Sequence, residues 1–353
     1  MRPWSPRHPR LWFIAMGDKA APPRVRTITD LARLAGVSAG TVSRALAGNK
    51  LVNPETRARI TDLARAHGFR PNQMASRLRT KRTATIGIVI PLGHERHQHI
   101  SDPFFMTMLG QLADRITENG CDILLKRVIP EDPDWLSRIC DSGMLDGVVL
   151  IGQSDQMAAI EAVAEHYLPL VAWGHWAPGQ RHCAVGVDNR AGGRLAAEHV
   201  IARGARRLAF LGDVRGAEIA ARYEGFAAGA AARGVPVTLL PAHLAADEIE
   251  ADILRHADLI EGRFDAVLAA SDMIAMCALR ALADRGVLVP QAMAVMGFDD
   301  LPLATQTVPR LTTIRQDIAR GAALIVDALF RRIAGDPAPA QVMMPELVAR
   351  DSV

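Results

Sequence analysis

From about Thr85 onward, short apolar runs alternate with helical segments, and this alternation constrains the fold of most of the chain. The runs TIGIVIP (85–91) and DGVVLIG (146–152) have no polar face, which is typical of strands buried in a parallel sheet. FFMTMLGQLADRITENG (104–120) has the apolar spacing of a helix between two such runs. The pattern predicts parallel sheets joined by right-handed crossovers.

The expected elements form two series of similar size. Further strands are expected at 121–128, 168–174, 207–213, 265–272 and 294–300, and further helices at 135–145, 158–167 and 218–234. The second series is expected to begin within 185–204, near residue 188. We therefore predict an α/β body of two doubly wound subdomains over residues 84–353. Ligands bind such sheets beyond the carboxyl ends of the strands, so a cleft between the subdomains is expected.

Residues 27–48, TITDLARLAGVSAGTVSRALAG, read as a helix, a tight turn and a second helix. Ile28, Leu31, Ala32 and Leu34 give the first helix an apolar stripe, and Gly36 permits the turn. Helix-turn-helix units lay their second helix in the major groove of DNA. A short helical hairpin without a ligand is the alternative. The capping and outward-facing residues that we assign to DNA binding are Thr27, Ser38, Ala39, Gly40, Thr41, Ser43, Arg44 and Asn53.

The same segment carries helix-start signals. Thr27 with Asp30 fits a capping box, Ser38 is placed to cap the second helix, and Asn53 followed by Pro54 starts a third. We therefore expect an all-α domain over residues 25–70. Residues 71–83 would form a hinge whose helix is too short to be stable alone in water. Residues 1–24 are expected to be a disordered extension.

Charge separates the two regions. Residues 1–82 carry 17 Lys and Arg against 4 Asp and Glu, a net of +13, whereas the remainder carries 24 against 34, a net of −10. A basic segment that coincides with a helix-turn-helix is suited to neutralising phosphates, and the acidic body is not.

Other functional classes find little support in the residues. The chain contains no dinucleotide-binding glycine motif, P-loop or nucleophile elbow, so an enzyme on this fold is not favoured. A secreted solute-binding protein would need a signal peptide, and the apolar patch from Leu11 to Met16 is too short for one. The four cysteines fit neither zinc nor disulfide spacing. We expect a cytoplasmic protein with no membrane span and no cofactor.

Several motifs in order along the chain resemble one family. They are TITDLARLAGVS, GTVSRAL, NPETRARI, PNQMASRLR, VDNRAGG, ASDMIAM, GFDD and LTTIRQD. Together they are similar to the lactose-repressor (LacI/GalR) family, from about Thr27 to Arg350. The resemblance implies a regulator, usually a repressor of sugar-use genes, whose body has the type I fold of periplasmic sugar-binding proteins. It also implies a homodimer on pseudo-palindromic operator DNA, and we expect no tetramerisation helix.

The resemblance assigns roles within the DNA-binding region. Thr41, Ser43 and Arg44 would lie in or beside the major groove, Arg44 on a base or a phosphate. Ala39 and Gly40 hold positions that distinguish family members in operator preference, and both are small here. In the hinge, the minor-groove residues would be Ala75, Leu78 and Arg79. Leu78 would wedge into a base step and kink the duplex, and a contact with the protein core is its alternative.

The resemblance also implies an effector site, which we expect to bind a small sugar. A nucleobase or a sugar acid acting as co-repressor is the alternative. Carboxylates and arginine can hydrogen-bond hydroxyls while an aromatic ring stacks on the sugar. The alternatives for single residues are ordinary: a helix cap for Asp102, a core residue for Trp173, a surface ion pair for Arg222. The candidate residues are Asp102, Phe104, Trp173, His175, Asp188, Arg222, Asp272 and Asp299.

One cluster is not accounted for by the family. His94, His97 and His99 lie within six residues after the first expected strand. Spaced histidines can bind zinc or nickel. Because no Cys or carboxylate set obviously completes such a site, although Glu95 and Asp102 are near in sequence, we favour a polar loop and assign no metal.

Overall fold

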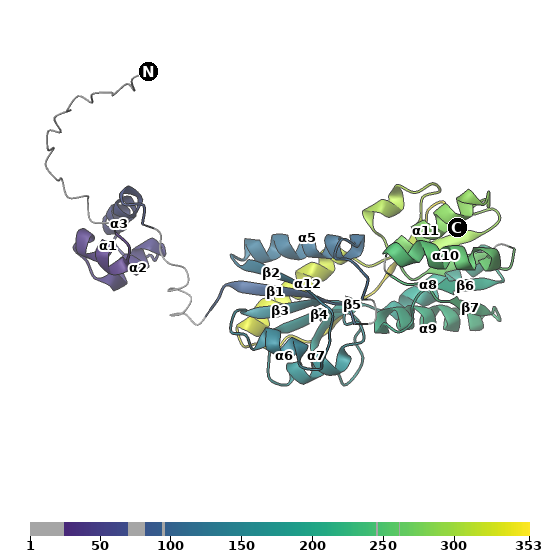
Figure 1. Cartoon of the computed structure of the whole chain (residues 1–353), viewed down its shortest axis with the longest axis horizontal. Helices are drawn as coiled ribbons and strands as arrows, with labels where there is room; N and C mark the ends of the chain where they lie inside the picture. Colours follow the sequence, from purple (N-terminus) through teal and green to yellow (C-terminus); the bar gives the residue numbers. More distant parts are fainter. Residues whose placement is uncertain (1–24, 70–81, 94–95, 245, 261) are drawn as a thin grey trace, which may run out of the picture. The chain divides into compact units, whose positions relative to one another are not determined.

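The computed structural model describes residues 25–69, 82–93, 96–244, 246–260 and 262–353. The chain divides into two units, residues 1–80 and 81–353, each considered by itself (Figure 1). The expected hinge residues Ala75, Leu78 and Arg79, and His94 and Glu95 of the histidine cluster, lie outside the described residues.

The first unit contains three helices around a small core. They are α1 (Ile28–Ala35), α2 (Ala39–Leu46) and α3 (Pro54–Ala66). The fully buried residues Leu31, Val42 and Ile60 come one from each helix. Leu34 was expected in the apolar stripe, but its side chain is 45% exposed, and Ala35 is buried instead. The predicted apolar stripe is therefore correct at Ile28, Leu31 and Ala32, and its last member is Ala35 in place of Leu34.

The second unit contains two six-stranded sheets. The first has the order β11-β5-β4-β3-β1-β2, with every paired strand parallel. Its strands are β1 (Thr85–Pro91), β2 (Asp122–Val128), β3 (Gly147–Ile151), β4 (Leu170–Trp173), β5 (Cys183–Val187) and β11 (Gln341–Met343). Its interior strands are buried on both faces, as the continuous apolar runs predict.

Helices cover both faces of the first sheet (Figure 1). They are α5 (Pro103–Glu118) and α12 (Ile318–Ile333) on one face, and α6 (Trp135–Cys140) and α7 (Met157–Ala164) on the other. α6 ends at Cys140, five residues before the expected end of that helix.

The second sheet has the order β12-β10-β9-β8-β6-β7, and β12 alone among its paired strands is antiparallel. Its strands are β6 (Leu208–Leu211), β7 (Val237–Leu240), β8 (Ala266–Ala269), β9 (Ala294–Asp299), β10 (Thr312–Arg315) and β12 (Glu346–Val348). The helices packed around it are α8 (Asn189–Ala202), α9 (Ala217–Ala231), α10 (Ala246–Ile260) and α11 (Asp272–Asp284), and a 3₁₀ turn, η1 (Pro302–Thr305), follows β9. This doubly wound architecture confirms the predicted fold class.

The path of the chain differs from two consecutive series. The second series was expected to begin within 185–204, near residue 188; β5 still belongs to the first sheet, and α8, which starts at Asn189, begins the second subdomain. After β10, the chain returns: α12 packs on α5, and β11 pairs with β5. β12 then joins the second sheet. Each subdomain is therefore built from separate stretches of the sequence.

No helix among the described residues has the length and apolar character needed to cross a membrane.

Candidate functional site

The helix-turn-helix unit begins each of its helices with a side-chain cap. The hydroxyl of Thr27 accepts from the Asp30 amide at 3.1 Å, and the Asp30 carboxylate accepts from the Thr27 amide at 3.1 Å. Ser38 accepts from the Thr41 amide at 3.1 Å, and Asn53 accepts from the Glu55 amide at 2.8 Å. These caps fix the three helix starts at the residues that the sequence predicted.

The turn between α1 and α2 depends on Gly36. Its φ of 64° lies in the left-handed region, and its amide donates back to the end of α1. The second helix is thereby presented with one face on the core, through Val42 and Ala45. On the other side, Ala39, Gly40 and Arg44 are exposed, while Thr41 and Ser43 are half-buried. The outward surface of α2 thus consists of two small residues followed by one cation.

In the second unit, a partly open cavity lies beyond the carboxyl ends of strands from both sheets. This is where doubly wound sheets bind ligands. Five of the predicted effector residues line it: Asp102, Phe104, Trp173, Arg222 and Asp299. They come from the start of α5, from the last residues of β4 and β9, and from α9.

Arg222 lies in the floor of the cavity with most of its side chain buried. Its Nε donates to Oδ1 of Asn189 at 2.9 Å, and its Nη1 donates to the carbonyl of Ala270 at 2.5 Å. Its guanidinium lies 3.9 Å from the centroid of the Phe298 ring, a cation–π contact. Burial lowers the pKa of Arg222, against the opposing effect of Asp299. The side chain is held rigidly before any ligand arrives.

The helix that carries Arg222 is placed by a close crossing with α8. A Cβ added at Gly193 would lie 2.0 Å from the carbonyl oxygen of Arg222, and one at Gly225 would lie 2.0 Å from that of Arg190. Only glycine allows the two backbones to approach so closely. The crossing therefore sets the depth of Arg222 in the cavity.

Asp299 is the last residue of β9 and adopts a φ of 128°, outside the range usual for a non-glycine residue. Its Oδ1 accepts from Nε2 of Gln316 at 2.6 Å and lies 3.6 Å from Nη1 of Arg222. Burial raises the pKa of Asp299 to about 8, although Arg222 acts in the opposite direction. This carboxyl can hold a proton near neutral pH and can then donate to a ligand.

Asp102 faces the cavity from the start of α5. Its carboxylate caps the helix by accepting from the Phe104 amide at 2.8 Å, and it accepts from Nε2 of Gln98 at 3.1 Å. Burial raises the pKa of Asp102. Asp102 therefore both caps α5 and lines the cavity.

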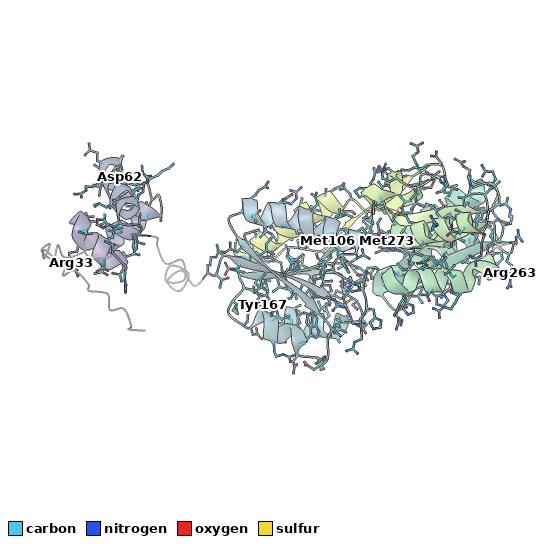
Figure 2. The ribbon with its side chains drawn as sticks, turned by 45° about the horizontal axis from the view of Figure 1, so that its top comes forward. Arg33, Asp62, Met106, Tyr167, Arg263 and Met273 are labelled. Atoms are coloured by element: carbon cyan, nitrogen blue, oxygen red, sulfur yellow. The ribbon has the colours of Figure 1, made fainter. Side chains whose placement is uncertain are left out.

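Aromatic rings form an apolar wall of the cavity. The ring centroids of Phe104 and Trp173 are 6.2 Å apart at 46°, and those of Phe104 and Phe105 are 6.0 Å apart. Met273, labelled in Figure 2, contributes from the first turn of α11. A cavity lined by both polar side chains and aromatic rings is suited to a ligand with hydroxyls around an apolar ring face.

Three predicted effector residues are absent from the cavity lining. Asp188 caps α8 by accepting from the Ala191 amide at 2.8 Å. His175 is held through its backbone, whose amide donates to Gln153 and whose carbonyl accepts from it, both at 2.9 Å. Asp272 is fully buried beneath the cavity.

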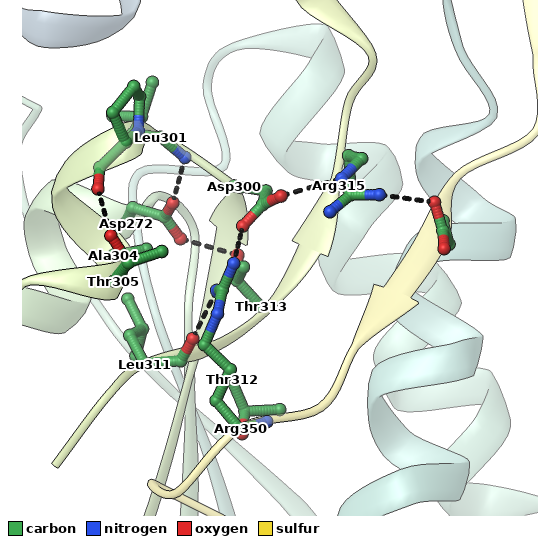
Figure 3. A network of polar contacts seen from close by, with 12 residues as sticks. Asp272, Asp300, Leu301, Ala304, Thr305, Leu311, Thr312, Thr313, Arg315 and Arg350 are labelled. Atoms are coloured by element: carbon green, nitrogen blue, oxygen red, sulfur yellow. Dashed lines mark hydrogen bonds and ion pairs between the residues drawn. The ribbon is translucent and has the colours of Figure 1, made fainter.

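Asp272 belongs to a network that fixes the end of β9 (Figure 3). It accepts from the Leu301 amide at 2.7 Å and from the hydroxyl of Thr313 at 2.6 Å. Beside it, Asp300 accepts from Arg315 at 2.7 Å and pairs with Arg350. Burial raises the pKa of Asp272 to about 6. The network ties β9, β10 and the segment after β12 together around Asp299.

Several polar lining residues were not predicted: Gln98, Ser154, Glu218, Ser271 and Gln316. Ser154 follows the carboxyl end of β3, a signal that sequence reasoning could have used. Gln316 follows β10, which was not expected to be a strand. Glu218 lies in the first turn of α9, four residues before Arg222, and this helical spacing places both on one face.

His97 has a partner that the sequence did not suggest. Its Nδ1 lies 2.7 Å from Oε1 of Glu248 on α10, in an exposed pair. Among the described residues, no group of three or more His, Cys, Asp or Glu side chains is arranged to hold a metal ion.

Comparisons with known proteins add family information. Residues 27–72 match the family described as bacterial regulatory proteins, lacI family, and residues 197–353 match the periplasmic binding protein-like domain. The chain is 30% identical over 342 residues to the HTH-type transcriptional regulator GalS of Salmonella typhimurium, covering 93% of this chain and 96% of that protein. It is 27% identical to the transcriptional repressor PurR of Mannheimia succiniciproducens, covering 93% and 98%.

Solved structures share the fold. The lac repressor dimer bound to operator and the anti-inducer ONPF superposes with a TM-score of 0.80 at 23% identity, covering 92% of this chain and 98% of that one. A complex of the transcriptional regulator CelR with cellobiose gives a TM-score of 0.65 at 26% identity, covering 93% and 100%.

Proposed function

Because this chain belongs to the lacI family of bacterial regulatory proteins, we propose that it represses carbohydrate-utilisation genes and that a small sugar-type effector controls its operator affinity. The relatives are helix-turn-helix transcriptional regulators. The chemical class of the effector and the assignment as a repressor are our proposal. The domain boundaries are proposed with it: DNA binding in 25–70, a hinge in 71–83, and effector binding in 84–353.

The Arg222–Asp299 pair is the observation that carries the sugar assignment. An arginine fixed by Asn189 and Ala270, next to a carboxyl that can donate or accept, offers directed hydrogen bonds to hydroxyls. The aromatic wall of Phe104 and Trp173 offers a stacking surface for a sugar ring.

DNA recognition is proposed for the outward surface of α2 and for the hinge. Arg44 would contact a base or phosphate beside Thr41 and Ser43, and small Ala39 and Gly40 would allow close approach to the groove or meet a thymine methyl. Thr27, Ser38 and Asn53 fix the helix starts from which backbone amides face phosphates. A homodimer would place two such units on a pseudo-palindrome, with Ala75, Leu78 and Arg79 of paired hinges in the minor groove.

A nucleobase is the second candidate effector. The PurR relative and the pair of aromatic rings, which could also hold a planar base, favour a nucleobase over a sugar acid. His175, Asp188 and Asp272 would then support either ligand from outside the cavity lining.

One experiment tests operator binding and effector control together. A duplex is selected by the full chain from a pool of randomised pseudo-palindromes, and its affinity is measured by fluorescence anisotropy with and without each compound of a panel. Sugars and nucleobases are first screened by thermal shift, because a ligand of the native state raises the melting midpoint. We expect a stabilising sugar to change operator affinity at least tenfold, equivalent to about 1.4 kcal/mol of coupling. A purine that acts while sugars do not would replace the effector class, and failure to select any duplex would overturn the regulator proposal.

A further inference from the structure

The charged residues that line the cavity are unequal in sign. Asp102, Glu218 and Asp299 are acidic, and Arg222 is the one basic residue among the described lining residues. The acidic residues come from three different elements, the starts of α5 and α9 and the end of β9. A ligand in this cavity therefore meets an excess of carboxylates from several sides.

Arg222 offsets only part of this excess, because its one positive charge faces two acidic side chains, those of Asp102 and Glu218, even when Asp299 holds a proton. Two of its nitrogens donate to Asn189 and Ala270, and Nη1 lies 3.6 Å from Oδ1 of Asp299. Glu218 lies close enough to interact electrostatically with Arg222, yet no salt bridge joins them. Burial raises the pKa of both Asp102 and Asp299, because uncompensated negative charge is costly in a partly dry site.

Glu218 supplies a second and independent observation. Its Oε1 is buried and has no hydrogen-bond partner among the described residues. A buried acceptor without a donor costs free energy, and a donor brought by a ligand would recover it. Phe104 and Trp173 line the same cavity as this carboxylate, and aromatic faces stabilise cations.

These features discriminate between classes of ligand. A sugar acid or phosphate would add negative charge to three carboxyl groups. A metal ion is not favoured, since no group of three or more ligating side chains among the described residues is suitably arranged. A neutral sugar would satisfy hydrogen bonds and leave the charge excess in place.

We propose that the effector is a sugar-like polyol that carries a protonated amine, and that Glu218 is the residue that selects the amine. The ammonium group donates to Glu218, while hydroxyl groups bind Arg222, Asp299 and Asp102. This inference rests on the proposed function of the cavity as the effector site, and it adds the chemical class of the ligand.

The experiment compares matched pairs of sugars on the full chain. Dissociation constants are measured by calorimetry at pH 6.5 for D-glucosamine against D-glucose and D-galactosamine against D-galactose, with N-acetyl-D-glucosamine and D-glucuronate as neutral and anionic probes. We expect the amine of at least one pair to bind tenfold or more tightly than its hydroxyl partner, and both other probes to bind more weakly than that amine. Glu218→Gln should reduce the preference at least fivefold. Glu224→Gln is the matched control, because Glu224 lies on the same helix but pairs with Arg190 at the surface.

The outcomes separate this inference from the proposed function. If neutral sugars bind as well as or better than their amines, the amine inference is wrong and the sugar-effector proposal survives. If only a nucleobase binds, both are wrong. A preference for amines that Glu218→Gln leaves intact would overturn the role of Glu218. The midpoint of thermal unfolding without ligand verifies that the variant folds, and replacing a carboxylate whose buried Oε1 has no partner among the described residues should not lower it.

Discussion

Nη1 of Arg222 lies 3.6 Å from Oδ1 of Asp299, and the side chain of each is less than a tenth exposed. Arg222 also donates to Oδ1 of Asn189 and to the carbonyl of Ala270, and its removal leaves these two buried acceptors unpaired, which together costs about 2–6 kcal/mol. We therefore expect Arg222→Met to lower the free energy of unfolding by this amount in urea titrations, and to abolish the effector response. Arg190→Met is the control, because Arg190 makes a solvent-exposed pair worth at most about 1 kcal/mol. Equal losses in the two variants would contradict a special role for the buried pair.

Asp299 should make the body less stable as pH rises. Its pKa is about 8 in the folded chain against 3.8 as the reference, so the folded state binds more protons than the unfolded state between these values. Stability from the protonated carboxyl is present at low pH and is lost as pH rises toward 8. Asp299→Asn should flatten this loss between pH 5 and 8, and asparagine has nearly the same shape as the aspartate that adopts this φ. The measurement is the unfolding free energy across that range. A slope as steep as that of the natural chain would exclude Asp299 as its source.

Asp272 should be a structural residue whose loss disturbs the site indirectly. Asp272→Ala removes the acceptor for the Leu301 amide and the Thr313 hydroxyl, and each buried donor left unpaired costs about 1–3 kcal/mol. We expect a clear fall in unfolding free energy by chemical denaturation. Asp284→Ala, at the exposed end of the same helix, should change it by less than about 0.5 kcal/mol. A stable Asp272→Ala chain that still lost effector binding would instead indicate direct ligand contact.

Arg44 should contribute to DNA affinity without contributing to folding. It is exposed on α2, outside the core formed by Val42 and Ala45. Arg44→Met should weaken binding to the selected duplex by about 1–3 kcal/mol if Arg44 contacts a base, whereas a phosphate contact would reduce the salt slope by about one. Anisotropy at several salt concentrations measures both. Arg65→Met on α3, where Arg65 pairs with Asp62, is the matched control. An unchanged affinity in Arg44→Met would remove Arg44 from the interface.

The sequence patterns that predicted structure correctly were those that only one local conformation explains. The capping residues Thr27, Ser38 and Asn53 and the turn at Gly36 appear where the sequence placed them. Strands with continuous apolar runs were equally clear, since burial on both faces leaves no room for polar residues.

The polar strand β10 and the very short edge strands escaped prediction for the converse reason, although the edge strand β2 was expected at 121–128. β10 contains the buried threonines Thr312 and Thr313, which do not read as an apolar run. β11 and β12 have three residues each, too few for a pattern. Because β10 was not predicted, Gln316, which follows it, was not recognised as a residue at the carboxyl end of a strand. The spacing of apolar residues also gives no sign that α12 packs on the first sheet.

The predicted effector residues include some that line the cavity and some that do not. Asp102 and Asp299 follow strands that were predicted, and both line the cavity. Asp188 and Asp272 also follow strands but do not line the cavity: Asp188 caps α8, and the fully buried Asp272 accepts from the Leu301 amide and the Thr313 hydroxyl. The position of a residue in the sequence predicts that it lies at the carboxyl end of a strand. The direction of its side chain depends on the hydrogen-bond donors around it.

The interleaved path of the chain between the subdomains has a genetic consequence. Because β11 and β12 are edge strands of different sheets and lie together within the last thirteen residues, a single late stop codon would strip an edge from both halves of the body. Neither half corresponds to one uninterrupted stretch of the gene, so recombination could not exchange the ligand-facing part of one half by a single crossover.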